Sequence, residues 1–190
     1  MFTQIGQFLL ETLFGFFVYL LLLRFHMQWL RAPFRNPVGE FLAVLTNWMV
    51  LPARRFIPGL FGLDLATLFL AWLAEMLMWL LLLLLRGLSL AAAPGAAFGV
   101  LAALGAIELA RLSLNLLIGV VIAQVVLSWV NPRTPLAPVF HALTQPFYRV
   151  FQRFIPPIGN IDLSPLFVVL IAQVLQFPLA ALAQTVTRLL

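Results

Sequence analysis

Four long apolar runs dominate the pattern of hydrophobic and polar positions along the chain. They cover about residues 8–29, 65–85, 112–130 and 166–183. Each run is close to the roughly 20 residues that an α-helix needs to cross the hydrocarbon core of a bilayer. We therefore expect an all-α membrane protein with about four transmembrane helices.

A fifth apolar stretch covers residues 89–110. It is rich in alanine and glycine and is interrupted by Pro94 and Gly95. Proline and glycine both disfavour a continuous helix. We expect this stretch to be an apolar linker or a re-entrant helix that does not cross the membrane completely.

The chain also contains an internal repeat. Seven residues recur at a spacing of ninety-eight positions, namely Thr46, Arg55, Phe56, Ile57, Pro58, Asp64 and Leu65, which match Thr144, Arg153, Phe154, Ile155, Pro156, Asp162 and Leu163. Such self-similarity indicates duplication of one structural unit. We expect residues 1–88 and 111–190 to be two tandem repeats in the same orientation, joined by residues 89–110. Each repeat would consist of a span, an amphipathic interfacial helix and a second span.

The basic residues support this arrangement. Seven arginines lie between the two spans of a repeat, namely Arg31, Arg35, Arg54, Arg55, Arg133, Arg149 and Arg153. By the positive-inside rule both segments face the cytoplasm. Only Arg86, Arg111 and Arg188 would lie toward the opposite side. A fifth span would invert the second repeat and divide the seven arginines between the two faces, so we favour four spans.

Each inter-span segment carries an amphipathic pattern. Apolar residues recur at helical spacing at Phe140, Leu143, Phe147, Val150, Phe151 and Phe154, with His141, Gln145, Arg149 and Gln152 opposite. A similar stripe, Phe41, Val44, Leu45 and Trp48, precedes Pro52, where we expect the first helix to break. We expect Pro146 to open a helix, with Thr144 near its cap. The arginines Arg54, Arg55, Arg149 and Arg153 then suit either anionic lipid headgroups or a cytoplasmic protein partner.

A proline-rich turn leads from each interfacial segment into the next span. Asp64 and Asp162 stand just ahead of these spans, and Ser164 followed by Pro165 is a helix-start signal. A carboxylate in that position accepts hydrogen bonds from the exposed amides of the first helical turn. We expect helix-capping roles, and a cation or proton site built from the two aspartates is the alternative.

Two charged residues lie inside the predicted spans of the first repeat. Glu75 occupies the centre of its run, where a charge costs at least about 3 kcal/mol. Arg24 either extends toward the interface or pairs with Glu75. The second repeat has Gln124 and Gln173 at the matching positions, which argues against a symmetric pore. We expect Gln173, together with Asn115 and Gln176, to form hydrogen bonds between helices.

Composition excludes several kinds of chemistry. The chain is 64% hydrophobic and contains no cysteine, which rules out a water-soluble domain, disulfides and thiolate metal sites. His26 and His141 stand alone, without a second ligand at metal-binding spacing. We expect no metal, no cofactor and no enzymatic activity. The net charge of +5 fits membrane orientation better than nucleic-acid binding, because the arginines lie at interfaces.

The motifs resemble those of the YggT family of bacterial integral membrane proteins. The second repeat carries the characteristic residues Asn131-Pro132, Leu143-Thr144-Gln145-Pro146 and the turn at 155–165, and the first repeat carries Arg24, Trp29, Asn36-Pro37, Leu45-Thr46, Arg54-Arg55 and Ile57-Pro58. The chain departs from the pattern at Trp48, Ala66 and Gln124. The resemblance implies a multi-pass protein of the bacterial inner membrane. It also implies a connection with osmotic tolerance and cation homeostasis, with cell division, or, in plastid relatives, with cytochrome assembly.

These observations favour a non-enzymatic scaffold, assembly or osmotic-homeostasis factor acting through its basic surface helices. The alternative is a small channel or transporter component for K⁺ or osmolytes, with Glu75 and Arg24 as its polar element. Expected partners are anionic lipid headgroups and a membrane or cytoplasmic protein, and a second copy of the chain is a further candidate. Nucleic acid is not expected.

Overall fold

The computed structural model describes residues 2–60, 62–87, 94–155 and 162–189. These residues form six helices, namely α1 (Phe2–Trp29), α2 (Pro37–Phe56), α3 (Leu65–Leu85), α4 (Pro94–Val130), α5 (Ala137–Gln152) and α6 (Ser164–Thr187). Four of them, α1, α3, α4 and α6, are long and apolar enough to cross a membrane. The prediction of an all-α membrane protein with four spans is confirmed.

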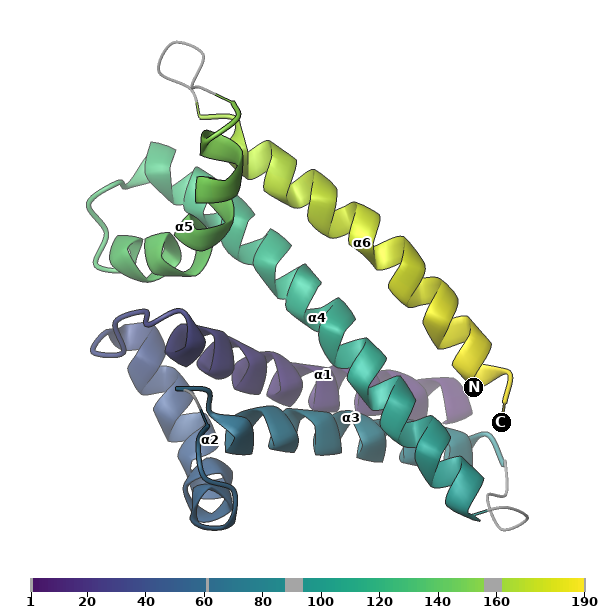
Figure 1. Ribbon diagram of the computed structural model, residues 1–190. Coiled ribbons are helices and arrows are strands. Elements are labelled where there is room, and N and C mark those ends of the chain that lie inside the picture. Colours follow the sequence, from purple (N-terminus) through teal and green to yellow (C-terminus); the bar gives the residue numbers. More distant parts are fainter. Residues whose placement is uncertain (1, 61, 88–93, 156–161, 190) are drawn as a thin grey trace.

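The four long helices form two pairs. Helix α1 packs along α3, helix α4 packs along α6, and α3 contacts α4 to join the pairs (Figure 1). The shorter helices α2 and α5 lie at one end of the bundle, and both chain termini lie at the other. We call the first end the basic end, because α2, α5 and their flanking loops carry the seven inter-span arginines.

Helix α4 corrects the prediction for residues 89–110. From Pro94 onward these residues form the first part of one continuous helix of 37 residues, so they are not a separate linker or re-entrant element. Pro94 is the first helical residue, where its missing N–H costs nothing, so it does not interrupt the helix. At 1.5 Å per residue the helix is about 55 Å long, well beyond the hydrocarbon thickness of about 30 Å. Residues 88–93, and with them the predicted boundary between the first repeat and the linker, lie outside the described residues.

The two internal prolines were predicted wrongly. Helix α2 continues through Pro52 to Phe56, and α5 begins at Ala137 and continues through Pro146, so neither proline ends or opens a helix. Thr144 is a buried residue within α5 whose hydroxyl donates to the carbonyl of Phe140. Each proline lacks the N–H of one helical hydrogen bond, and α5 bends along its length (Figure 1).

Local sequence signals determine where α2 begins and where α3 ends. Asn36 caps α2 by accepting hydrogen bonds from the backbone N–H groups of Val38 and Gly39, and Pro37 follows as the first helical residue. Helix α3 ends before Gly87, which adopts φ of +75°, a conformation that glycine tolerates best. These signals set the length of α3 and the point at which α2 turns away from α1.

An apolar cluster holds the basic end together. It brings Met27 of α1 and Leu42 of α2 together with Val120 of α4 and with Val139 and Leu143 of α5. Both interfacial helices are therefore anchored to one shared core. Their opposite faces remain available at the surface.

Candidate functional site at the basic end

The exposed arginines gather at the basic end. Six of the seven inter-span arginines have exposed side chains, namely Arg31, Arg35, Arg55, Arg133, Arg149 and Arg153. The seventh, Arg54, is only partly exposed because it forms an ion pair. Of the four predicted surface arginines, Arg55, Arg149 and Arg153 therefore present their charge to the surroundings, whereas Arg54 is committed within the fold.

Apolar side chains lie beside these arginines. The stripe predicted on the first interfacial helix faces away from the bundle, since Phe41, Val44 and Trp48 are exposed while Leu42 and Val50 are buried. On α5 some residues of the predicted stripe are buried and others are exposed. Leu143 packs inward, whereas Val150 and the flanking Phe154 are exposed. Basic and apolar side chains on one surface are the composition that interfacial membrane helices use.

Arg54 and Asp64 tie the end of α2 to the start of α3. The guanidinium donates from Nη2 to Oδ2 of Asp64 over 2.5 Å and from Nε to Oδ1 over 3.3 Å. Asp64 is also the N-cap of α3, where it accepts hydrogen bonds from the backbone N–H and the hydroxyl of Thr67. Burial acts to raise the pKa of Asp64, but the hydrogen bonds from Arg54 and Thr67 outweigh it and hold that pKa below its usual range.

Asp162 makes the corresponding tie in the second half of the chain. Its carboxylate accepts hydrogen bonds from the backbone N–H of Ser164 over 2.8 Å and from Nε2 of Gln152 over 2.9 Å. Gln152 stands ninety-eight positions after Arg54, so a neutral donor replaces a charged one. Ser164 is the first residue of α6, and its own hydroxyl is buried without a partner in the residues that the structure describes. The proline-rich residues 156–161 before it lie outside the described residues.

The Arg54–Asp64 tie predicts a dependence of stability on pH. Because the folded-state pKa of Asp64 lies below its unfolded value, the ionised carboxylate stabilises the fold above about pH 4, and this stabilisation is lost as the pH falls through the folded-state pKa. We expect Asp64→Asn, which keeps the cap, to remove about 1 kcal/mol at pH 7 and to flatten the acid limb of the stability curve. Thermal unfolding in detergent between pH 7 and pH 3 measures this. Acid limbs of equal slope in the variant and the wild type would rule it out.

A second pair of ties joins α1 to α2 and α4 to α5. Arg24 is 4% exposed, and its Nη1 donates to Oγ1 of Thr46 over 2.5 Å and to Oδ1 of Asn47 over 2.8 Å. It therefore turns toward the interfacial helix, and its partners are neutral side chains rather than Glu75. In the second half, the hydroxyl of Thr144 bonds to the side-chain amide of Gln124.

The two pairs of ties differ in the same way. Where the first half uses Arg24 and Arg54, the second half uses Gln124 and Gln152. Sequence reasoning noted Thr46 and Thr144 as repeated residues but missed their role as partners of the spans. The signal was present, because a threonine recurs in each interfacial helix while its polar partner recurs in the preceding span.

Glu75 stands apart from these ties. Its side chain is 1% exposed, and within the described part of the chain its Oε2 has no hydrogen-bond partner. Apolar residues that include Val18, Leu21 and Ala71 pack together in the same bundle. Of the predicted interhelical amides, Gln176 donates to Oδ1 of Asn115 over 2.8 Å and so links α6 to α4, whereas Gln173 is exposed.

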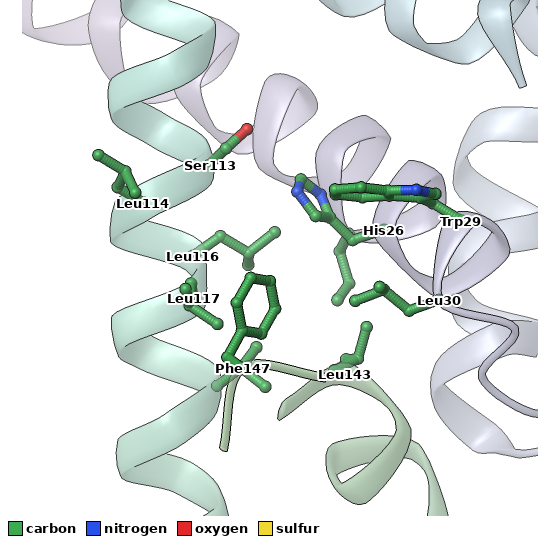
Figure 2. A pocket seen from close by; sticks show the side chains of 11 residues that line it. His26, Trp29, Leu30, Ser113, Leu114, Leu116, Leu117, Leu143 and Phe147 are labelled. Carbon is green, nitrogen blue, oxygen red and sulfur yellow. The ribbon is translucent and has the colours of Figure 1, made fainter. Parts of the chain in front are cut away.

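A mainly apolar crevice of about 190 Å³ lies between α1, α4 and α5. Figure 2 shows the rings of His26 and Trp29 on α1 opposite Leu116 and Leu117 on α4, with Phe147 of α5 closing the space below them. Nδ1 of His26 lies 2.7 Å from the carbonyl oxygen of Leu22. Within the described part of the chain no group of three His, Cys, Asp or Glu side chains occurs that could hold a metal ion.

The sequence model of the CCB3/YggT protein family matches residues 3–85 and 103–183 of this chain. The chain belongs to the CCB3/YggT family. Similar proteins include a Vibrio alginolyticus protein from the proC 3′ region, which is 35% identical over 84% of this chain and 85% of its own length. The Escherichia coli K12 protein YggT is 30% identical over 96% of this chain and 93% of its own length. No solved structure matches the chain significantly.

Membership agrees with the multi-pass helical fold and indicates no family of enzymes. The two matched segments each contain one long helix pair, α1 with α3 and α4 with α6, together with the interfacial helix between its members. The polar ties described above therefore all lie within the matched segments. They are features of the part of the chain that carries the YggT family character.

Proposed function

We propose that this YggT-family chain is a non-enzymatic membrane scaffold that acts by contact, as an assembly or osmotic-homeostasis factor. The observation that carries the proposal is the basic end. There, exposed arginines and exposed aromatic side chains lie on or beside two helices that are tied to the spans by Arg24, Arg54 and their counterparts. A surface held in this way is preorganised, so little conformational entropy is lost when a partner binds.

The basic end would face the cytoplasm of a bacterial inner membrane. Arginine-rich loops are retained on that side, and anionic lipid headgroups attract each such side chain by about 1 kcal/mol. Trp48 and Phe154 would enter the headgroup region, and Arg149 and Arg153 would remain at its surface for a protein partner. Four spans return the chain to the same side after each repeat, which keeps both interfacial helices together.

The double variant Arg149→Gln/Arg153→Gln tests this function. We expect it to insert normally but to lose its proximity-labelled neighbours and its ability to support growth of a deletion strain at raised osmolarity. Arg86→Gln is the matched control, because it removes an exposed arginine outside the basic end. Full activity of the double variant, at normal protein level in the membrane, would count against the scaffold.

The alternative is a component of an ion or osmolyte pathway. The observation that favours it is Glu75, whose buried Oε2 has no partner among the residues that the structure describes. Arg24 would not share such a pathway, since its guanidinium is engaged by Thr46 and Asn47. Potassium flux in liposomes decides between the two functions. Flux that disappears in Glu75→Gln supports the pathway, and absence of flux under an imposed gradient removes it.

A further inference from the structure

A cavity with a partly polar lining, which we call the polar cavity, lies at the end of the bundle opposite the basic end. It measures about 440 Å³ and is bounded by α3, α4 and the last turns of α6. Its polar lining consists of Trp79, Glu108, Arg111, Gln184, Thr187 and Arg188. By contrast, the crevice between α1, α4 and α5 and a second cavity between α1, α2 and α3 have almost entirely apolar linings. This cavity therefore needs its own explanation.

Two buried N–H groups in the lining have no partner among the described residues. They are Nε of Arg111 and Nε1 of the Trp79 indole. By contrast, Nε1 of Trp72, on the same helix, donates to the carbonyl of Ala102 over 2.9 Å. Buried donors normally find acceptors, so two unpaired donors beside one cavity point to an acceptor that the described residues do not supply.

The charges of the lining favour an anion. Arg111 donates to Glu108 over 2.7 Å, which satisfies the carboxylate of this cavity and leaves Arg188 as excess positive charge. The carbonyl end of α6 contributes roughly half a negative charge, which is less than the full charge of that arginine. A cation would meet only a carboxylate that is already paired with Arg111, whereas an anion would meet the full charge of Arg188 and the remaining N–H groups of Arg111 and Trp79.

The position of the cavity indicates which anion. Arg188 follows directly on the span Ser164–Thr187, so the mouth of the cavity lies where a spanning helix leaves the hydrocarbon. Phosphate oxygens suit guanidinium donors, which bind them through several parallel hydrogen bonds. We propose that this cavity binds a phosphate group, carried either by an anionic lipid headgroup or by free phosphate, through Arg111, Arg188 and Nε1 of Trp79.

The full-length protein in dodecylmaltoside tests the site with two probes. Short-chain phosphatidylglycerol is followed by native mass spectrometry, and inorganic phosphate is followed by calorimetry. We expect the affinity for the bound probe to fall at least about tenfold in Arg111→Gln/Arg188→Gln and to stay unchanged in Arg86→Gln. Saturable phosphatidylglycerol binding without phosphate binding identifies a lipid headgroup, and saturable phosphate binding identifies the free ion.

Two further variants keep the test decisive. Arg188→Gln alone changes an exposed side chain at the end of α6 and should fold even where the double variant does not. Trp79→Phe removes only the indole N–H and should weaken binding several-fold, whereas Trp72→Phe should not. If neither probe binds saturably, or if Arg188→Gln and Trp79→Phe both bind as tightly as the wild type, the site does not exist. This site is independent of the scaffold function, because the basic end takes no part in it.

Discussion

Gly39→Ala should destabilise the protein by about 3 kcal/mol, the largest loss that we expect from a single methyl group. Gly39 is buried in the first turn of α2, and an added Cβ would lie 2.1 Å from the carbonyl oxygen of Phe34. Backbone at that distance cannot move aside without displacing the Asn36 cap, which accepts the N–H of Gly39. The free energy of unfolding, measured by titrating dodecylmaltoside micelles with dodecyl sulfate, gives the loss directly.

Gly119→Ala is the control for this prediction. Gly119 lies within α4, and outside its own helical turn no atom of the described residues lies within 4 Å of an added Cβ. Alanine has the higher helix propensity, so this variant should be as stable as the wild type or more stable by up to about 1 kcal/mol. Equal stability of the two alanine variants would mean that α2 does not approach Phe34 as closely as described.

Thr46→Val should remove about 1.5–3 kcal/mol, because it takes a hydrogen-bond acceptor from a buried guanidinium. Thr46 is fully buried, and valine fills nearly the same volume, so the change isolates the hydroxyl. Arg24 would keep Asn47 as a partner but lose its contact of 2.5 Å with Thr46. The same unfolding titration measures the loss.

Thr144→Val supplies a matched comparison in the other half of the chain. Thr144 is equally buried, but its partner in α4 is the neutral Gln124, so about 1 kcal/mol should be lost. Arg24→Gln combined with Thr46→Val should recover part of the difference, since no charge then remains without its acceptor. Equal losses at Thr46 and Thr144 would show that the charge of Arg24 contributes nothing to this tie.

The spans were predictable because the bilayer imposes a length and an apolar composition that can be recognised directly in the sequence. The start of α3 at Leu65 and the end of α1 at Trp29 follow the predicted limits. The start of α4 did not follow, because Pro94 and Gly95 weaken a helix in its interior but not at its first turn. The sequence shows where a proline stands in the chain, but not whether that position is the start or the interior of a helix.

The polar ties were harder to predict. Arg24 could be placed within a span, but its partners depend on how α2 returns across α1, and that geometry rests on the Asn36 cap and the space left by Gly39. Arg54 looked equivalent to Arg55 in the sequence. The two arginines are adjacent in the chain, yet Arg54 reaches Asp64 and Arg55 is exposed. The orientation of the last turn of α2 determines this difference.

The length of α4 links the two ends of the molecule. A helix longer than the hydrocarbon thickness fits the bilayer by tilting, and the angle of that tilt changes with the thickness of the membrane. One rigid rod contributes Arg111 to the polar cavity and Gln124 to the tie with α5. A thinner or thicker bilayer therefore changes the tilt of both places together, and the distance between Arg111 and Gln124 stays constant because one helix carries both.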